Sequence, residues 1–281
     1  MRDLRYQPLT KTVVFVVLSL LAATFILPFL WTIASALRPA GPLYTYANPL
    51  TWETFFPKSP TLKNFAHIFT KLKFGRALAN SLFVGVSVVA LGVVVNSMAG
   101  FAFAKFQFPL KYVLFALVLL TFMVPFESIV IPLYVVVQRM GILNTYLALI
   151  LPGVANGMAI FVFRQFFADI PSELLEAARV DGASWARIFA QIVVPLAKPA
   201  IISVMIMLFM LNWNALFWPL VAVHSSTLEV VQVAVTSHVA QEETHWANLF
   251  SSAFAASLPP MLLFLFLQRH FVRGITATGF K

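Results

Sequence analysis

Long hydrophobic windows alternate with short polar segments along the whole chain. Six windows are free of charged residues, apart from a single Glu in the third, and they cover residues 12–37, 77–104, 112–138, 140–163, 199–228 and 244–268. Each window reaches or exceeds the roughly 20 residues that a helix needs to cross the apolar core of a bilayer. The windows are continuously apolar, with Gly and Pro inside, which favours helices over the alternating strands of a membrane barrel. The pattern predicts six transmembrane helices.

Composition agrees with this pattern. Of the 281 residues, 60% are hydrophobic and only 10% are charged, whereas about 25% are charged in soluble domains. The mean hydropathy is +0.89. The expected fold class is therefore an all-α integral membrane protein.

The first window resembles a cleavable signal peptide in two respects. Basic residues precede it, and Ala34-Ser35-Ala36 has the small-residue spacing of a signal-peptidase site. Its apolar region of more than about 20 residues is too long for a signal peptide. We therefore expect a first helix that is retained in the membrane.

Lys and Arg set the predicted topology. With the N-terminus inside, most of the 19 Lys and Arg residues fall in cytoplasmic segments, as the positive-inside rule requires. The exception is a basic cluster between Arg38 and Arg76. Within it, Leu62 to Leu78 has roughly helical apolar spacing, which predicts an amphipathic helix on the outer membrane interface. Both termini are expected to be cytoplasmic. A net charge of +9 might suggest nucleic acid, but in a membrane protein the distribution of Lys and Arg matters more than the sum, so we expect contact with membrane lipid and no nucleic acid.

One polar stretch interrupts the second half of the chain. It reads SELLEAARVDGASWARIFAQIVVP, residues 172–195, and the topology places it in the cytoplasm between helices four and five. A helix is expected to start at Pro171-Ser172 and to stop at Gly182, since glycine readily takes the left-handed conformation. A second helix is expected near Ser184 and leads into the fifth span. As a physical pattern, the stretch also fits a plain connector between two spans.

The same stretch carries a family signature. Glu176-Ala177-Ala178, then Gly182, Ile192 and Pro195 match the EAA-x3-G-x9-I-x-L-P pattern of binding-protein-dependent ABC importer permeases, with Val194 in place of Leu. Seven further landmarks of the carbohydrate, maltose-type branch occur in its order: NSL at 80–82, AFAKFQFP at 102–109, IPLY at 131–134, LNTYLALILP at 143–152, RQFFADIP at 164–171, WNALFWPL at 213–220 and QRHFVRG at 268–274. The chain thus resembles this family over roughly residues 60–281.

The resemblance implies a division of the chain and a set of partners. The expected parts are a first transmembrane helix at 12–37, an extracytoplasmic loop with an interfacial helix at 38–76, a core permease domain at 77–270 and a cytoplasmic tail at 271–281. The implied location is the plasma (inner) membrane of a prokaryote, and the implied partners are a second permease subunit, two ATPase subunits and an extracytoplasmic solute-binding protein. The loop at 222–248 is expected to contact the binding protein through residues that include Glu229, Glu242, Glu243 and Trp246.

In this family the polar stretch is the coupling helix, which fits a cleft in the ATPase subunit. Carried over by motif position, the coupling residues are Glu176, Ala177, Ala178 and Gly182, with Glu173, Leu174 and Asp181 as neighbours. A capped helix on a glycine joint suits this role, because it is a rigid element that can pass a displacement to the fifth span.

No catalytic set is present in the sequence. No Gly is followed by Lys, so the chain lacks a G-x4-G-K loop for nucleotide phosphates. The five histidines form no H-E-x-x-H motif, and there is neither a G-x-S-x-G motif nor any cysteine. We expect no enzyme activity, metal site or cofactor in this chain, and we expect ATP and Mg to bind the partner ATPase subunits.

Two places in the apolar windows are candidates for the solute path. Glu127 follows Pro125 in the third window, and a carboxylate there faces protein or water instead of lipid. It either contacts solute or lies near the outer mouth at a proline break. Asn212 and Asn214 flank Trp213, a combination of amides and ring that suits a sugar, although buried Asn also joins neighbouring helices. Asn96 and the Gly153-x3-Gly157 pair are expected mainly to serve helix packing.

The function expected from these features is that of a transmembrane permease subunit of an ATP-driven, binding-protein-dependent importer for a sugar or related carbohydrate. The windows contain no central Lys or Arg, which favours a neutral solute. Two alternatives remain at this point: ABC import of a glycerol phosphate ester, and an ion-coupled secondary transporter that uses Glu127. A membrane scaffold without transport would explain the helices but not the polar stretch.

Overall fold

The computed structural model describes residues 8–39, 51–237 and 246–278, and these residues form helices with no β-strand. The all-α fold is therefore confirmed. Four helical segments are long and apolar enough to cross a membrane: Lys11–Ala36, Phe74–Lys105, Tyr146–Ala168 and Trp246–Gln268. Two bent pairs raise the number to six if each pair counts as one span. One pair joins Lys111–Thr121 to Phe126–Arg139 at 105°, and the other joins Trp185–Leu196 to Lys198–Trp213 at 81°.

The chain divides into two compact units. Unit 1 comprises residues Met1–Gly75 and Val235–Ser257, and unit 2 comprises Arg76–Ala234 and Leu258–Lys281. The helices of unit 1 are α1 (Pro8–Ala36), η2 (Trp52–Thr54) and α2 (Lys63–Thr70). Three helices contain residues of both units, namely α3 (Phe74–Lys105), α13 (Val231–Ser237) and α14 (Trp246–Thr278). The other helices of unit 2 are α4 (Lys111–Met123), α5 (Phe126–Arg139), α6 (Tyr146–Val154), α7 (Gly157–Ala168), α8 (Ser172–Val180), α9 (Trp185–Ile188), η3 (Phe189–Val193), α10 (Val194–Leu196), α11 (Lys198–Trp213) and α12 (Phe217–Ala222).

Unit 1 is organised around the C-terminal end of α1. The amide nitrogen of Asn64 in α2 donates to the carbonyl oxygens of Ala36 at 2.8 Å and Arg38 at 2.6 Å. Ser251 in α14 donates to the same Ala36 oxygen at 3.2 Å. These bonds satisfy carbonyl groups that every helix leaves unpaired at its end. Ala34, Ser35 and Ala36 are all buried, so the small residues that imitate a cleavage site lie inside the fold.

The interfacial helix expected from Leu62 to Leu78 is shorter in the structure. α2 ends at Thr70, and Lys73 adopts a positive φ of 54°, after which α3 begins at Phe74. A side chain in this left-handed conformation cannot continue a right-handed helix. Within α2, Ile68 is buried while Lys63, His67 and Thr70 are exposed, which is the contrast of an amphipathic helix.

The fifth hydrophobic window also differs from its expected form. α11 ends at Trp213, so residues 199–228 do not make one helix. The bent pair instead places α9, η3 and α10 before α11, and Pro199 lies in the first turn of α11. Pro199 has no N–H to donate to the carbonyl of Pro195, four residues earlier, which accounts for the break around Ala197.

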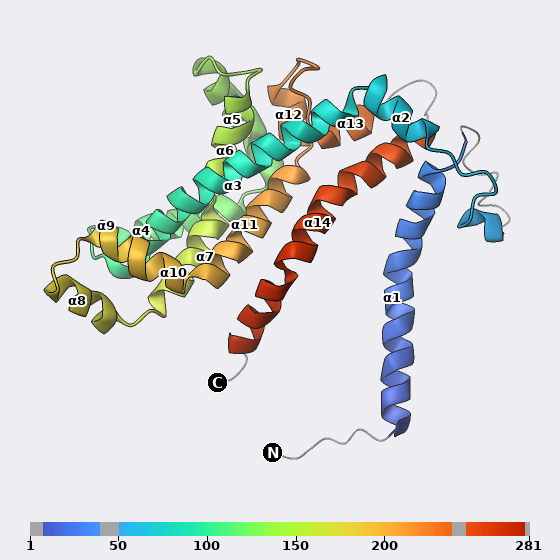
Figure 1. Ribbon diagram of the computed structural model, residues 1–281. Helices are drawn as coiled ribbons and strands as arrows, with labels where there is room; N and C mark the ends of the chain where they lie inside the picture. Colours follow the sequence, from blue (N-terminus) through green and yellow to red (C-terminus); the bar gives the residue numbers. More distant parts are fainter. Residues whose placement is uncertain (1–7, 40–50, 238–245, 279–281) are drawn as a thin grey trace. The chain divides into compact units, whose positions relative to one another are not determined.

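Unit 2 packs closely where glycines lie at helix crossings. A Cβ added at Gly100 in α3 would lie 2.6 Å from the Cβ of Phe163 in α7. A Cβ at Gly92 would lie 2.8 Å from Leu208 in α11. α7 packs in turn against α4 and α11. Small residues let membrane helices approach in this way. Within unit 2, Figure 1 shows α8 at one end and α12 with the α5–α6 connection at the other.

Candidate functional site: a polar helix pair and a cavity

The polar stretch 172–195 folds as a helix, a glycine turn and a second helix, as its sequence predicts. α8 begins at Ser172 directly after Pro171 and is followed by Gly182 at φ +82°. The N–H of Ala183 donates to the carbonyl oxygen of Ala178 at 2.9 Å, and the N–H of Gly182 donates to the carbonyl oxygen of Arg179 at 3.0 Å. This bond pair is the Schellman arrangement that satisfies the last carbonyls of a helix. The Ser184 hydroxyl then caps the start of α9.

Arg179 fastens the two helices across the glycine turn. Its guanidinium donates to the carbonyl oxygen of Ala183 at 2.9 Å and lies 5.4 Å from the ring centroid of Trp185. Trp185 packs edge-on against Phe106, with ring centroids 4.9 Å apart, and lies 6.2 Å from Phe101 in α3. The helix pair is therefore anchored to the end of α3 by aromatic contacts. The sequence pattern alone does not mark Arg179, Trp185 or Phe106 as site residues.

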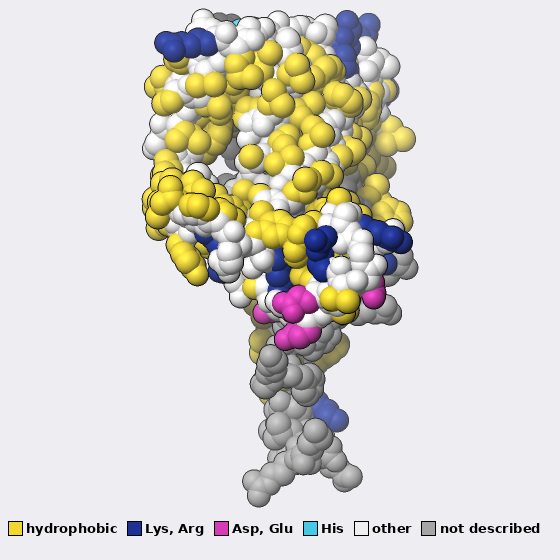
Figure 2. Space-filling model, turned by 90° about the vertical axis from the view of Figure 1, so that its left-hand side faces the viewer, with side chains coloured by type: hydrophobic (Ala, Val, Ile, Leu, Met, Phe, Trp, Pro, Cys, Tyr) yellow, Lys and Arg dark blue, Asp and Glu magenta, His cyan; other side chains and the backbone are white. Residues whose placement is uncertain are grey.

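One face of α8 remains open. Leu175 is buried against the protein, and Ala178 is half-buried. The remaining predicted coupling residues are exposed, namely Glu173, Leu174, Glu176, Ala177, Asp181 and Gly182. Figure 2 faces this end of unit 2 and shows Asp and Glu side chains gathered below a broad hydrophobic surface. The structure thus brings the predicted coupling residues together on one accessible helix and its turn.

A continuous helical path runs from this pair toward the cavity. α9 passes into the π-helical turn η3 and then α10, and the chain bends by 81° before α11. π-helical turns are rare and occur mostly at functional sites. α11 carries Asn212 at its far end. Displacement of α8 and α9 therefore has a covalent route to the cavity described next.

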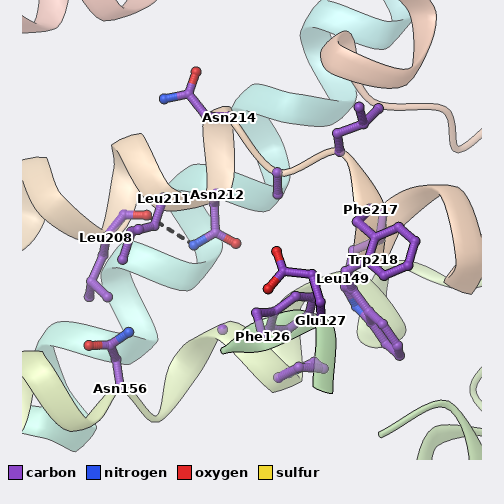
Figure 3. A pocket seen from close by; sticks show the side chains of 14 residues that line it. Phe126, Glu127, Leu149, Asn156, Leu208, Leu211, Asn212, Asn214, Phe217 and Trp218 are labelled. Atoms are coloured by element: carbon purple, nitrogen blue, oxygen red, sulfur yellow. Dashed lines mark hydrogen bonds between the residues drawn. The ribbon is translucent and has the colours of Figure 1, made fainter. Parts of the chain in front are cut away.

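A cavity of about 510 Å³ lies in unit 2 among α5, α6, α11 and the segment that enters α12. Its volume falls in the range typical of small-molecule sites. The cavity is lined by Phe126, Glu127, Leu149, Pro152, Gly153, Asn156, Leu208, Leu211, Asn212, Asn214, Ala215, Leu216, Phe217 and Trp218. Figure 3 shows Glu127 and Asn212 directed toward its interior from opposite sides.

Glu127 lies in the first turn of α5, just after the bend between α4 and α5. Pro125 occupies the position before this helix, and Glu127 is exposed to the cavity. The positive end of the helix dipole favours a carboxylate at such a position. The side chain therefore lies at a proline break and also lines the cavity, and its contact with solute stays a prediction.

The predicted cluster around Trp213 separates into residues inside and outside the cavity. Trp213 is only 2% exposed, stacks on Phe209 at 5.3 Å and is absent from the cavity lining. Asn214 contributes to the rim, but Figure 3 shows its side chain turned away from Glu127. The aromatic lining comes from Phe126, Phe217 and Trp218. The sequence pattern alone does not mark these three residues as candidates for the solute path.

Trp218 also repairs a backbone defect beside the cavity. Pro152 lies inside α6 and has no N–H to offer the carbonyl of Ala148, four residues earlier. The indole Nε1–H of Trp218 donates to that oxygen at 2.9 Å. The bond fixes the start of α12 against α6 and positions the cavity wall.

Asn96 performs a similar task at the break between α6 and α7. The Asn96 side chain is fully buried. Its amide nitrogen donates to the carbonyl oxygen of Val154 at 2.7 Å, and its amide oxygen accepts from the backbone N–H of Asn156 at 2.8 Å. Asn156 in turn caps α7 through Ala159. The expected packing role of Asn96 therefore includes satisfying the backbone of a broken helix. Gly153 also packs closely, because a Cβ there would lie 3.1 Å from the Asn212 oxygen.

At the other end of unit 2, polar side chains hold the segment between α12 and α13. The side-chain amide nitrogen of Asn80 donates to the backbone carbonyl oxygens of Thr227 at 3.0 Å and Glu229 at 2.8 Å. The Asn80 side-chain oxygen accepts from the Tyr146 hydroxyl at 2.7 Å. The Ser81 hydroxyl accepts from the N–H of Val231 at 2.7 Å. Two expected contact residues of the loop, Glu242 and Glu243, lie outside the described residues.

Glu229 sits in this clamped segment and is half-buried. Burial raises the pKa of its carboxyl above the usual glutamate value, and the nearby Arg76 guanidinium partly offsets this rise. The Arg76 guanidinium also donates to the Ser226 carbonyl at 3.3 Å. The carboxyl is thus coupled electrostatically to the start of α3.

Comparison with known proteins identifies the family of this chain. Residues 92–277 match the family described as the binding-protein-dependent transport system inner membrane component. The chain belongs to this family. Its members are transport permeases of the inner membrane and not enzymes. The helix pair, the glycine turn and the cavity all lie within or beside the matched range.

Three curated relatives show which permeases are similar. The arabinooligosaccharides transport system permease protein AraQ of Halalkalibacterium halodurans is 30% identical over 276 residues, 98% of each chain. The lactose transport system permease protein LacG of Rhizobium radiobacter is 32% identical over 92% of each chain. The sn-glycerol-3-phosphate transport system permease protein UgpE of Pectobacterium atrosepticum is 35% identical over 72% of this permease and 73% of the relative.

A solved structure shares the fold of this permease. A chain of a bacterial ABC transporter involved in import of the acidic polysaccharide alginate superposes with a TM-score of 0.82. The alignment covers 95% of this permease and 98% of that chain at 18% sequence identity. A second structure contains the alginate transporter in complex with an alginate-bound periplasmic protein and gives a TM-score of 0.59.

Proposed function

We propose that this permease imports a carbohydrate and is driven by ATP that binds, with Mg, to separate ATPase subunits. The solute class is supported by relatives named for arabinooligosaccharides and lactose transport, of which one aligns over 98% of both chains. The complete importer would contain this chain, a second permease, two ATPase subunits and an extracytoplasmic binding protein. The chain itself supplies the path and the coupling contact, and it holds no cofactor.

The observation that carries the coupling proposal is the open face of α8. Exposed Glu173, Leu174, Glu176 and Ala177 project from a helix whose other side is anchored through Leu175. Val180 at the end of α8 is 88% exposed, so this end of the helix also offers an apolar side chain to a partner. We assign this face, with Asp181 and Gly182, to the cleft of an ATPase subunit. The aromatic anchor at Trp185 would pass the motion of the ATPase to α3.

The solute path is assigned to the cavity that contains Glu127 and Asn212. Support comes from its volume of about 510 Å³ and from the two polar side chains that face its interior. We also retain Asn214 as a rim residue and Trp213 as a buried support beneath Asn212. At the opposite end of unit 2, the clamped segment with Glu229 is assigned to the contact with the binding protein. Trp246, which begins α14 in unit 1, is proposed separately as a contact residue.

The coupling contact is tested by a matched pair of alanines. Ala177 on α8 and Ala186 on α9 are both exposed. Ala177→Arg should reduce recovery of the ATPase subunits with affinity-tagged permease at least tenfold, because a long charged side chain would block the cleft. Ala186→Arg should leave recovery within twofold of the wild type. Equal losses in both variants, or no loss with Ala177→Arg, would contradict the assignment of α8.

The source of energy is tested with the complete importer in proteoliposomes. Radiolabelled lactose, arabinotriose and sn-glycerol 3-phosphate serve as probes, each with its cognate binding protein. Uptake of one of them should require ATP and should disappear when the ATPase subunits are omitted. Uptake that persists without the ATPase and follows a proton or sodium gradient would support the ion-coupled alternative instead.

A further inference from the structure

The cavity in unit 2 has an unusual charge character. Among its fourteen lining residues, Glu127 is the only ionisable one, and no Lys, Arg or His contributes to the wall. Within the ranges that the structure describes, the ion pair found joins Lys58 to Glu53, and no cation is paired with Glu127. A carboxylate without a cationic partner leaves the cavity with net negative charge.

Asn212 adds a second acceptor on the facing wall. Its amide nitrogen donates to the Leu208 carbonyl at 2.9 Å, which is the bond drawn in Figure 3. Its oxygen is therefore the atom turned toward the cavity, and the absence of a Cβ at Gly153 leaves room for it. The polar atoms presented to a solute by these two residues are thus oxygen acceptors.

Partly exposed rings lie next to the acceptors. Phe126 precedes Glu127 in α5 and is 39% exposed, and Phe217 at the start of α12 is 46% exposed. Aromatic faces pack against the C–H surface of a sugar ring, while carboxylate and amide oxygens accept from its hydroxyl groups. The combination matches a neutral solute that is rich in hydroxyl groups.

We propose that this cavity is a solute subsite in which Glu127 determines charge specificity, admitting neutral polyhydroxylated solutes and excluding solutes that carry phosphate or carboxylate. The proposal rests on the proposed function as an importer. An anionic group would find no Lys, Arg or His in this wall to neutralise it, and it would also meet the like charge of Glu127. Repulsion of this kind grows where the walls reduce the effective dielectric constant.

The test uses the complete importer in proteoliposomes with the three probes named above. ATP-dependent uptake of lactose or arabinotriose should exceed uptake of sn-glycerol 3-phosphate at least tenfold. Glu127→Lys should lower uptake of the neutral probe at least tenfold, because Lys donates where the hydroxyl groups need an acceptor. Glu127→Gln keeps an acceptor oxygen and should lower uptake less than Glu127→Lys does.

Asn212 and Asn214 supply a matched control for structural damage. Both amides donate to the carbonyl four residues earlier at 2.9 Å, but only Asn212 faces Glu127. Asn212→Ala and Asn214→Ala therefore lose the same kind of backbone bond. Asn212→Ala should raise the KM for the neutral probe several-fold, and Asn214→Ala, at the rim, should raise it less. Equal effects would assign both residues to helix packing and overturn the subsite.

Two readouts separate this proposal from the proposed function. ATP hydrolysis stimulated by the loaded binding protein in the wild-type importer reports on the proposed function, whereas the ratio of uptake between the neutral and the anionic probes reports on charge specificity. If ATP-dependent uptake occurs but sn-glycerol 3-phosphate is the preferred probe, or if Glu127→Lys transports normally, the charge-specificity proposal is wrong while the importer remains. Absence of ATP-dependent uptake of every probe would overturn the proposed function itself.

Discussion

The Arg179 guanidinium lies 5.4 Å from the ring centroid of Trp185, on the far side of the turn made by Gly182. Arg179 belongs to α8 and Trp185 opens α9, so the contact holds two helices at one angle. The same Trp ring packs against Phe106 at the end of α3. The helix that presents the proposed coupling face is thereby held by its neighbour and by the bundle.

Trp185→Ala should loosen this anchor. Aromatic pairs contribute about 0.5–1.5 kcal/mol and exposed cation–π contacts about 0.5–1 kcal/mol. Loss of the contacts with Arg179 and Phe106 should therefore raise hydrogen exchange at residues 183–188 roughly tenfold and lower the solute transported per ATP hydrolysed. Trp185→Phe keeps a ring and should show the smaller change. Unchanged exchange in Trp185→Ala would show that the ring does not hold α9.

Gly182→Ala should disturb the turn through backbone strain alone. Gly182 has φ +82° with open space around it, and an L-residue in this conformation costs on the order of 1–2 kcal/mol. Recovery of ATPase subunits with tagged permease should fall several-fold. Gly141 has φ +69° with equally open space, so Gly141→Ala carries similar strain away from α8 and should leave recovery unchanged. Equal losses would attribute the effect to general instability.

Asn96→Ala should destabilise the break between α6 and α7. The substitution removes the partners of the Val154 carbonyl and the Asn156 N–H, and an unsatisfied buried group costs about 1–3 kcal/mol. The apparent Tm in detergent should fall by several degrees. Ser97 is buried beside it but bonds only to Val94 within the same helix, so Ser97→Ala should lower Tm less. A larger effect at Ser97 would contradict this account.

Glu229 should make stability depend on pH. Burial raises the pKa of its carboxyl, so the folded state binds a proton at pH values where the unfolded chain has released it. The stabilisation is complete below the usual glutamate pKa and is lost as pH rises through the raised value. The apparent Tm of the wild type minus that of Glu229→Gln should therefore be higher at pH 4 than at pH 7. An opposite slope would show that Arg76 dominates over burial.

Sequence alone was sufficient for the local features that glycine, proline and hydrophobicity control. The start of α8 after Pro171, its stop at Gly182 and the new helix at Ser184 all follow from backbone preferences of single residues. Other boundaries depended on neighbours. The helix expected to continue to Leu78 ends at Thr70, and the apolar window 199–228 is divided after Trp213, because hydropathy records which residues tolerate lipid and not where the backbone bends.

The cavity shows the same division between local and tertiary information. Glu127 and Asn212 stood out in sequence as polar residues in apolar windows, yet Trp213, which lies between two such amides, proved to be buried. Trp218 cannot be recognised as a site residue from sequence alone, because its role depends on the carbonyl of Ala148, 70 residues away in the chain. Pro152 has no N–H to donate to that carbonyl, so the Trp218 indole takes its place. No local pattern records a bond of this length.

The sequence by itself determined the membrane class, the all-α fold, the family and the helix–glycine–helix unit at 172–195, because periodicity, hydropathy and residue conformation act over a few neighbouring positions. Only the tertiary structure decided that Trp185 anchors this unit to α3, that Asn96 satisfies a broken helix and that Glu127 faces Asn212 across a cavity without cations. These relationships depend on helix crossings, where glycines such as Gly100 allow backbones to approach and bring distant side chains into contact.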